Sequence, residues 1–400
     1  MRVIVFCHSL ISDWNHGNAH FLRGIVSELL ARGHDVRTWE PADAWSLANL
    51  TRDHGLEPRT AFQRAYPTLR PRQYDADLDL DAALDGADLV IVHEWNDPAL
   101  VARIGNARGA GGEFLLLFHD THHRAITAAD EMAGYDLRHY DGVLAFGSIL
   151  REIYLERGWT QRAWTWHEAA DTRVFRPLPR DDVRGDLVWI GNWGDDERSA
   201  ELREFLVDPV RELGLRAAVH GVRYPDDAQQ LLVTAGIRYD GWLPNFLVPR
   251  VFAHYRATLH VPRRPYARSL PGIPTIRPFE AMACGIPLVS APWDDTDGLF
   301  RAGTDYLVAR NAAEMQEQLR CVLTDPVLAE SLAISGRRTI LERHSCVHRV
   351  DELLQICHEL GRTVAGDEMP HDLRQPADTA RRSACGTATA TATRVATVRS

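Results

Sequence analysis

The chain has 400 residues, of which 45% are hydrophobic and 25% are charged. This length suffices for two or three domains of roughly 150 residues each, and the composition is that of an ordinary globular protein. The formal net charge of −10 argues against a nucleic-acid-binding protein, which needs positive charge to neutralise phosphates. All 45 basic residues are arginine, so any phosphate site must use arginine, and chemistry that needs a lysine amine is excluded.

The cysteines and the start of the chain indicate the compartment. The six cysteines have no metal-like pair spacing, which favours buried thiols in a reducing compartment over a disulfide framework. The first residues are typical of a strand and not of a signal peptide, and no apolar run approaches the ~18 residues of a membrane span. We therefore expect a cytoplasmic protein with no transmembrane segment.

In the first half of the chain, short apolar runs alternate with segments of helical period, which is typical of parallel βα units. The predicted strands cover residues 3–7, 36–39, 89–93, 114–118 and 143–146. A helix is predicted from about 18 to 32, because its apolar residues share one face and Gly33 ends it. Residues 41–80 lack a clear period, and we expect loops with short helices there.

The second half repeats this pattern after a segment rich in proline and charge, so we place an interdomain linker at 173–186. Its predicted strands cover residues 187–190, 217–220, 237–239, 258–261, 287–290 and 306–308, with helices at 200–213 and 313–323 among them. A terminal helix within 344–362 closes the fold. Residues 363–400 are low in complexity and rich in threonine and alanine, and we expect them to be disordered.

These elements predict an α/β protein with two tandem doubly wound Rossmann-like domains, at 1–172 and 187–343, that face a cleft. Ligands of open parallel sheets bind beyond the carboxyl ends of the strands. The loops that follow strands are therefore the places to search for functional residues.

Two loops of the first domain carry candidate side chains. Gly17 and Asn18 precede a helix, where backbone N–H groups can meet a phosphate or sugar oxygen. In the same loop Asp13, His16 and His20 could supply a general base, or could serve as turn and capping residues.

A second loop follows the fourth strand, where His119 and Asp120 reach the predicted cleft edge. They could bind metal together with His122 and His123, but no matching partner site is evident, so we expect no metal. A hydrogen bond from His119 to a polar ligand is favoured instead, and a structural role is favoured for His122 and His123.

The second domain adds glycines and arginines after its strands. Gly191, Asn192 and Gly194 allow close backbone approach, and Arg198 begins the next helix, where it can reach a phosphate. Further arginines precede a single acid, Glu280; they are Arg263, Arg264, Arg268 and Arg277. Arginines and one carboxylate at a cleft match a nucleotide diphosphate, with arginine for the phosphates and Glu280 for the ribose hydroxyls.

Glu280 itself stands in the apolar run "RPFEAMACGIPLVSA", where an unpartnered carboxylate would be costly to bury. We place it at the first turn of a helix that Gly285, Ile286 and Pro287 end. The alternative is a carboxylate that only complements the helix dipole.

The segment "RPFEAMACGIPLVSA" resembles the donor-site signature of the GT-B glycosyltransferases, in which a Glu-Ala-Met-Ala-x-Gly-x-Pro-x-Val run opens a helix. "ADTRVFRP" resembles their interdomain segment, and "RHSCVHRVDELL" resembles the terminal helix of the branch named for spore-maturation glycosyltransferase-like proteins. The resemblance covers roughly residues 1–360. It implies a glycosyltransferase whose sugar donor is a nucleotide-diphosphate sugar.

The resemblance also implies roles for single residues. Glu280 would bind the donor ribose, the Ala281 and Met282 amides would lie near the phosphates or the sugar, and Arg198 would contact the diphosphate. His119 would face the transferred sugar, the Gly17 loop would cover the diphosphate, and Gly241 and Trp242 would border the base. Two features depart from the family: Gly272 stands where retaining members carry a second Glu, and Arg264 or Arg277 must replace a usual Lys.

The sequence thus predicts metal-independent sugar transfer to an unidentified acceptor, with no cofactor and with catalysis by His119, Asp120 and Arg198. The stereochemistry stays open, because Asp13, His16 or His20 would be the base of an inverting enzyme and no nucleophile is evident for a retaining one. Two alternatives also stay open: a sugar-nucleotide epimerase on the same fold, and a catalytically silent sugar-nucleotide-binding protein, which the missing acid at Gly272 favours.

Overall fold

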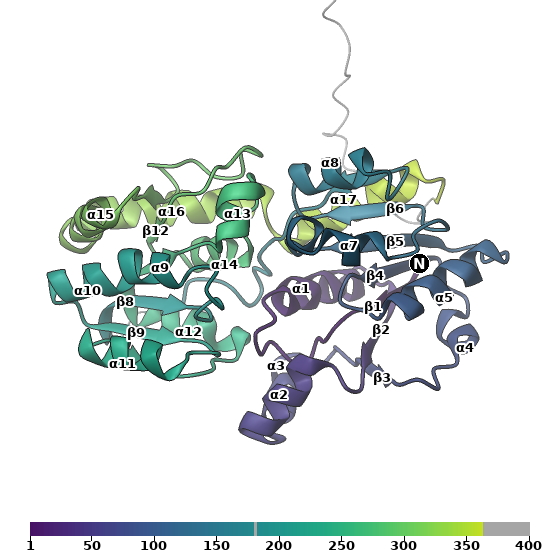
Figure 1. The fold of residues 1–400 in the computed structure, drawn as a ribbon, viewed down its shortest axis with the longest axis horizontal. Coiled ribbons are helices and arrows are strands. Elements are labelled where there is room, and N and C mark those ends of the chain that lie inside the picture. Colours follow the sequence, from purple (N-terminus) through teal and green to yellow (C-terminus); the bar gives the residue numbers. More distant parts are fainter. Residues whose placement is uncertain (180–181, 363–400) are drawn as a thin grey trace, which may run out of the picture. The chain divides into compact units, whose positions relative to one another are not determined.

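The computed structural model describes residues 1–179 and 182–362 (Figure 1). The tail predicted at 363–400 lies outside the described residues. In the described part of the chain, no helix is both long and apolar enough to cross a membrane.

The first half of the chain forms a parallel sheet in the order β3-β2-β1-β4-β5-β6-β7, which we call the N-terminal sheet. Its strands are β1 (Arg2–Phe6), β2 (Asp35–Pro41), β3 (Arg72–Tyr74), β4 (Leu89–His93), β5 (Leu115–Asp120), β6 (Gly142–Ala145) and β7 (Ala163–Thr165). All five predicted strands are confirmed within one or two residues. The sequence missed β3 and β7, because none of the three residues in either strand is buried and neither strand forms a run of apolar side chains.

The helices of this half are α1 (Asn18–Ala31), α2 (Trp45–His54), α3 (Glu57–Ala65), α4 (Leu80–Leu84), α5 (Pro98–Gly109), α6 (Arg124–Thr127), α7 (Ala129–Ala133) and α8 (Ser148–Glu156). The prediction for α1 is confirmed. Residues 41–80 hold two regular helices, α2 and α3, in addition to short turns. Both helices bury few side chains, which is why their period is weak in the sequence.

The second half forms a parallel sheet in the order β10-β9-β8-β11-β12-β13, the C-terminal sheet. Its strands are β8 (Gly185–Ile190), β9 (Ala217–His220), β10 (Arg238–Tyr239), β11 (Tyr255–His260), β12 (Leu288–Ser290) and β13 (Leu307–Val308). The sequence predicted all six. Strands covered on both faces are continuous apolar runs, and the two-residue strands β10 and β13 lie within the slightly longer predicted runs 237–239 and 306–308.

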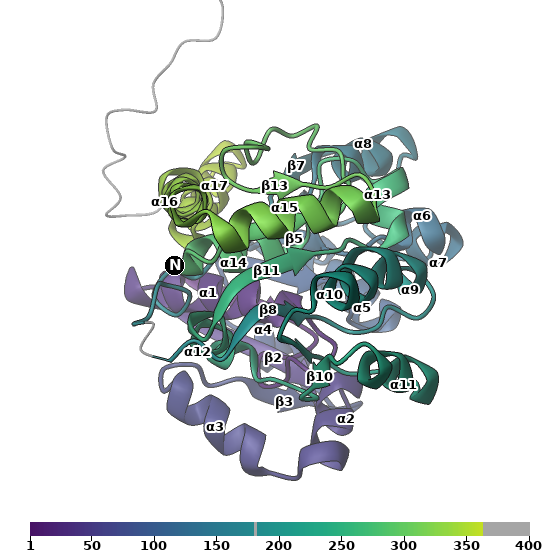
Figure 2. The same ribbon diagram turned by 90° about the vertical axis from the view of Figure 1, so that its left-hand side faces the viewer.

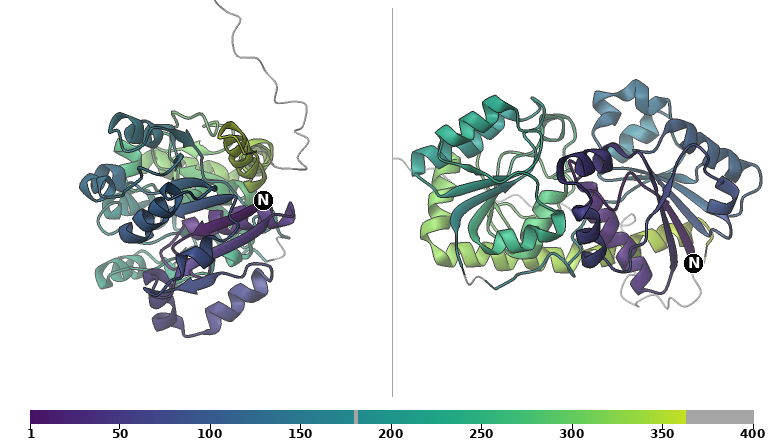
Figure 3. Two further views of the ribbon diagram at one scale, coloured as in Figure 1. Left: turned by 90° about the vertical axis from the view of Figure 1, so that its right-hand side faces the viewer. Right: turned by 90° about the horizontal axis from the view of Figure 1, so that it is seen from below.

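Helices cover both faces of the C-terminal sheet (Figure 2). The helices of the second half are α9 (Ser199–Leu202), a π-helical turn (Arg203–Val207), α10 (Asp208–Leu213), α11 (Asp226–Thr234), α12 (Val248–Ala253), α13 (Arg264–Ser269), α14 (Ile276–Cys284), α15 (Ala312–Thr324), α16 (Pro326–Arg343) and α17 (Cys346–Glu359). Along β8, Leu187 and Trp189 pack with α10, α11 and α15, whereas Val188 and Ile190 pack with α12 and α14. The C-terminal sheet therefore has the 3-2-1-4-5-6 order of a doubly wound Rossmann-like fold, and the N-terminal sheet has the same order with a seventh strand added at its edge. Figure 3 shows the two sheets with their flanking helices from two further sides, and the predicted fold class is confirmed.

Two segments of the second half pack against the N-terminal sheet. Helix α17 lies along α1 (Figure 1), and the Trp166 indole donates to the Arg349 carbonyl at 2.8 Å. Tyr266 and Ile273, on and after α13, belong to the hydrophobic core of the N-terminal sheet. These contacts hold the carboxyl ends of the two sheets beside a shared space.

Candidate active site

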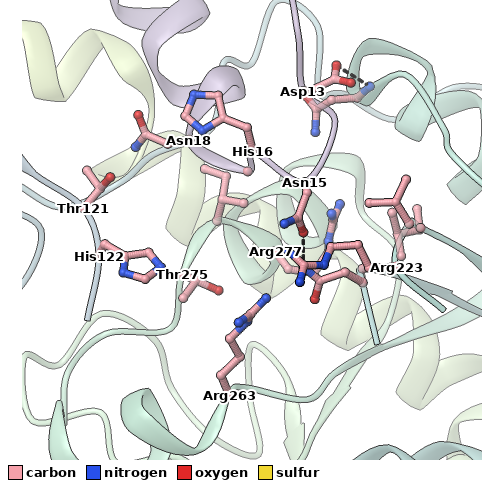
Figure 4. A pocket seen from close by; sticks show the side chains of 18 of the residues that line it. Asp13, Asn15, His16, Asn18, Thr121, His122, Arg223, Arg263, Thr275 and Arg277 are labelled. Atoms are coloured by element: carbon pink, nitrogen blue, oxygen red, sulfur yellow. Dashed lines mark hydrogen bonds between the residues drawn. The ribbon is translucent and has the colours of Figure 1, made fainter. Parts of the chain in front are cut away.

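A cleft of about 500 Å³ lies between the carboxyl ends of the two sheets. Its walls come from loops that follow strands of both sheets, as the fold predicts. Figure 4 shows His16, Asn18, Thr121 and His122 of the N-terminal half around the same space as residues of the C-terminal half. We call this space the inter-sheet cleft.

Four arginines of the C-terminal half line the inter-sheet cleft: Arg198, Arg223, Arg263 and Arg277. Three of them have carboxylate partners, since Arg223 pairs with Asp195 at 3.0 Å, Arg263 with Glu197 at 2.5 Å and Arg277 with Glu280. These pairs hold the guanidinium groups in place while leaving several N–H groups for a ligand.

Arg198 differs from the other three because none of the described carboxylates forms an ion pair with it. It donates to the Val261 carbonyl at 3.1 Å and to Asn192, and it lies over the Trp189 ring at 5.0 Å. Burial, with a contribution from the charge of Arg263, lowers the pKa of Arg198 to about 9. A half-buried cation without a counter-ion among the described residues is suited to an anionic ligand.

The amino end of α14 also faces the cleft. Thr275, Ile276 and Arg277 line it, and Thr275 has a φ of 61°, an unusual value for a threonine. The first backbone N–H groups of a helix have no partner within the helix, so this turn can bind an anion beside the arginines. The sequence placed the start of α14 near Phe279; the helix begins earlier because Pro278 needs no N–H partner in a first turn.

The loop at 13–18 bridges the two halves. The Asp13 carboxylate accepts hydrogen bonds from Arg23 at 2.9 Å, from the Trp242 indole at 3.0 Å and from the Asn245 amide at 2.9 Å. Asn15 bonds to Asn192. The loop therefore lines the cleft and contacts the C-terminal half, and three hydrogen bonds already engage the Asp13 carboxylate.

Glu280 does not line the cleft. Its side chain is fully buried, and its carboxylate accepts from His20 Nδ1 at 2.7 Å, from Asn245 Nδ2 at 2.6 Å and from Arg277. Burial alone would raise the pKa of Glu280, but Arg277, His20 and Asn245 together hold it below its usual value. The predicted first-turn position is wrong, because Glu280 is the fifth residue of α14. The alternative role, a carboxylate that only complements the helix dipole, is wrong as well, because Glu280 links the two halves through His20.

The other predicted site residues fall into two groups, those that line the cleft and those that do not. The cleft is lined by Asp13, His16, Gly17, Asn18, Gly191, Asn192, Arg198, Trp242 and Arg277. It is not lined by His20, His119, Asp120, Gly241, Arg264, Ala281 or Met282. Ala281 and Met282 lie in the core with their amides inside α14, and Arg264 pairs with Glu201 at 3.0 Å while its neighbour Arg263 faces the cleft.

His119 and Asp120 lie within β5 and are fully buried. Asp120 accepts from the Tyr154 hydroxyl at 2.8 Å, and burial together with the charge of Glu94 raises its pKa to about 7. His119 packs against Phe21 and Trp166, and burial keeps its pKa well below the ordinary value. Within 1–179 and 182–362 no group of three or more His, Cys, Asp or Glu could hold a metal ion.

Several residues of the cleft wall were not predicted from the sequence, among them Arg223, Thr275 and Glu168. Arg223 follows β9, so the strand-end rule could have selected it, and Thr275 directly precedes α14. Glu168 follows β7, a strand too short to be predicted. Burial raises the pKa of Glu168 to about 8.

A second cavity, of about 1040 Å³, opens beside the cleft at the carboxyl end of the N-terminal sheet. The two spaces share the rings of Trp45 and Trp95. The cavity adds Tyr74 and several carboxylates, among them Asp43 and Asp75. Aromatic faces beside hydrogen-bonding carboxylates can hold a polyhydroxylated molecule.

Gly272 occupies the place where the resemblance leads one to expect an acid. Its φ is 86°, and a Cβ there would lie 2.8 Å from the Asp297 carboxyl carbon. The Asp297 carboxylate itself accepts from the Ser148 amide at 2.9 Å and pairs with His167 at 3.1 Å. The backbone at 272 therefore admits no side chain without a rearrangement.

Comparisons with known proteins agree with this geometry. Residues 198–355 match the family described as "Glycosyl transferase-like", whereas no curated protein matches the chain. Among solved structures, it is similar to a Rickettsia africae glycosyltransferase, with a TM-score of 0.63, 11% identity, and coverage of 90% of this chain and 99% of that one.

Two further solved structures each cover 90% of this chain. One is Anabaena HepE in complex with UDP-glucose, with a TM-score of 0.63, 12% identity and all of that chain covered. The other is sucrose-phosphate synthase from Thermosynechococcus elongatus, with a TM-score of 0.61, 15% identity and 99% of that chain covered. The chain has the GT-B fold of these glycosyltransferases. The likeness to the spore-maturation branch stays a prediction.

Proposed function

We propose that this chain, which has the GT-B fold, transfers a sugar from a nucleotide-diphosphate donor to an acceptor hydroxyl. One observation carries the proposal: four arginines and the amino end of α14 converge on a cleft at the carboxyl ends of two parallel sheets. A diphosphate carries its charge on oxygens that guanidinium N–H groups and free helix amides bind together.

The donor diphosphate lies, in this proposal, against Arg198, Arg263, Arg277 and the first turn of α14. The nucleoside extends toward the loops after β9 and β10, where His220, Arg223 and Trp242 form the wall. Trp242 offers a ring beside the base, and its indole N–H is already held by Asp13.

The chemistry follows from the charge that develops on the departing diphosphate. As the bond to the sugar breaks, negative charge grows next to Arg198, which has no carboxylate partner among the described residues. This interaction strengthens toward the transition state and so lowers the barrier. We infer that arginines and helix amides replace a metal ion in this role.

The acceptor is expected on the side of the N-terminal sheet. Support comes from the second cavity, which meets the inter-sheet cleft at Trp45 and Trp95 and is lined with aromatic rings and carboxylates. A saccharide or another polyol would present its hydroxyls to those carboxylates and its apolar face to the rings. The identity of the acceptor is left to the assay.

Calorimetric titration tests the nucleotide part of the proposal. UDP, GDP, ADP, CDP and dTDP are titrated into the wild type with and without EDTA, and at least one should bind in both conditions. Arg263→Gln should weaken that nucleotide by about 1.5–3 kcal/mol, the contribution of a charged hydrogen bond.

The matched control is Arg138→Gln, an exposed arginine that pairs with Asp136 away from the cleft. It should leave the affinity unchanged. Binding of none of the five nucleotides, or binding that EDTA abolishes, would contradict the proposal.

Incubation with the corresponding nucleotide sugars then tests the reaction. A transferase releases the nucleoside diphosphate and forms a new glycoside. Recovery of an intact donor with an altered sugar would instead identify an epimerase, and an unchanged donor would identify a binding protein.

A further inference from the structure

Glu168 is a buried acid on the wall of the inter-sheet cleft that the proposed donor contacts leave unused. It is 5% exposed and lies at the junction between β7 and the segment that leads to the C-terminal sheet. Among the described residues, Asn18 alone forms a side-chain hydrogen bond with Glu168, from Nδ2 to Oε1 at 3.3 Å, which is long for a contact to a carboxylate. A buried carboxyl with so little support requires a further partner.

The backbone on both sides of Glu168 is firmly held. The His167 ring contacts the Phe146 carbonyl at 3.0 Å and Asp297 at 3.1 Å. The Ala170 amide donates to the His344 carbonyl at 3.0 Å. The fold thus fixes the backbone that presents the Glu168 side chain to the cleft, which favours a defined position for a reactive group.

The three residues that the sequence offered as a general base are poorly placed for that role. The Asp13 carboxylate is occupied by Arg23, Trp242 and Asn245, as described above. His20 contacts Glu280 through Nδ1 and accepts from the Asp171 amide through Nε2. His16 does line the cleft, but burial and the neighbouring His8 keep its pKa well below the ordinary value, so it binds a proton weakly.

We propose that the Glu168 carboxylate accepts the proton of the attacking hydroxyl during sugar transfer. This inference rests on the proposed function. The acceptor oxygen forms a bond to the anomeric carbon while its proton moves to a Glu168 oxygen. The bond from the anomeric carbon to the diphosphate breaks, and its electron pair goes to the diphosphate oxygen beside Arg198, Arg263 and Arg277.

The proton leaves Glu168 to water when the product departs. Attack by a deprotonated acceptor opposite the leaving diphosphate inverts the anomeric configuration. The proposal therefore also decides the stereochemistry, which the sequence left open.

Several groups around Glu168 set the pH at which it can act. Burial raises its pKa to about 8 and the carboxylates of Glu280 and Glu94 add to the rise, whereas the Asn18 amide and Arg277 oppose it. The Tyr266 phenol on α13 also faces this carboxyl and is neutral. In the unliganded protein the carboxylate fraction grows as the pH rises through about 8, and kcat/KM should rise with it.

The test compares Glu168→Gln with the wild type, using the nucleotide sugar of the nucleotide that the calorimetry selects. Two nucleophiles are supplied: glycerol, whose hydroxyl must lose a proton, and azide, which has none to lose. Release of nucleoside diphosphate gives the rate, and NMR of the glycoside gives its configuration. The control is Glu156→Gln, an exposed position at the end of α8.

We expect Glu168→Gln to lower kcat for glycerol by about 10²–10⁴-fold, the usual contribution of a general base. Transfer to azide and affinity for the nucleoside diphosphate should stay at the wild-type level. The rise of kcat/KM near pH 8 should disappear in Glu168→Gln, and the product should have inverted configuration.

If Glu168→Gln loses transfer to glycerol and to azide alike, Glu168 has a structural or binding role and the proposal is overturned. Unchanged transfer to glycerol in Glu168→Gln, or a glycoside that retains the anomeric configuration of the donor, would also overturn it. If glycerol is not accepted, release to water takes its place. A wild type that binds the donor but reacts with none of the three nucleophiles would also overturn it. Failure of the proposed function is distinct, because no nucleoside diphosphate would then bind the wild type.

Discussion

Replacing Glu280 with glutamine tests whether this acid supports the structure or binds the donor ribose. The wild-type carboxylate accepts from His20 and Asn245 through Oε1 and pairs with Arg277 through Oε2. Glutamine keeps one acceptor oxygen for His20 and Asn245 but turns an amide NH₂ toward the Arg277 guanidinium. The change therefore removes charge and one acceptor while keeping size and shape.

The magnitude follows from these contacts. Breaking a buried ion pair by removing one partner costs about 3–5 kcal/mol, because the remaining charge is left uncompensated. Glutamine keeps the hydrogen bonds to His20 and Asn245, so the loss should lie at the lower end of this range. We expect the free energy of unfolding to fall by about 3 kcal/mol at neutral pH.

The assay is urea unfolding followed by tryptophan fluorescence, with Glu156→Gln as the exposed control. Because the pKa of Glu280 is lowered in the fold, its stabilisation is present above the unfolded pKa of about 4.3 and is lost as the pH falls. The difference between wild type and Glu280→Gln should therefore shrink in acid.

The affinity of Glu280→Gln for the nucleoside diphosphate tests the opposing hypothesis, that Glu280 binds the donor ribose. Since Glu280 lies outside the cleft wall, Glu280→Gln should change the affinity for the bound nucleoside diphosphate by no more than about 0.7 kcal/mol, or threefold. Unchanged stability together with a large loss of affinity would refute this reasoning and favour the ribose contact that the sequence predicted.

Three further predictions concern the cleft and its surroundings. Arg198→Ala should lower kcat by about 10²–10³-fold with a smaller change in KM, as when one preorganised hydrogen-bond donor is lost. A normal kcat would contradict the role of Arg198. EDTA should leave wild-type turnover unchanged. Gly272→Ala should lower the free energy of unfolding in urea by about 2–4 kcal/mol, since it adds a clash with Asp297 to a strained φ. Its control is Gly33→Ala, at a φ of 82° with open space around it, which should lower that free energy by only about 1–2 kcal/mol. Equal losses would contradict the clash. Because the pKa of Glu168 is raised to about 8, the folded chain keeps a proton that the unfolded chain releases near pH 4. The free energy of unfolding should therefore fall as the pH rises from about 4 to about 8, and Glu168→Gln should lessen that fall. Parallel profiles of stability in urea for the wild type and the variant from pH 5 to 9 would contradict this prediction.

The sequence by itself determined most of the scaffold. Strands covered on both faces are short apolar runs, and this local signal is independent of the partners that cover them. Eleven of the strands in the two sheets were predictable, and β3 and β7 were not, since none of their residues is buried. The strand-end rule then selected the loops that hold Gly17, Asn192 and Arg198 on the cleft wall.

The tertiary structure alone decided which side chains reach the cleft. Arg263 and Arg264 are adjacent and alike in sequence, yet the turn into α13 directs one to the cleft and the other to Glu201. Glu280 finds its partner His20 across 260 positions of the chain, and Glu168 enters the cleft beside Asn18. Side-chain direction and distant partners depend on how whole elements pack, and no local pattern of residues encodes that packing.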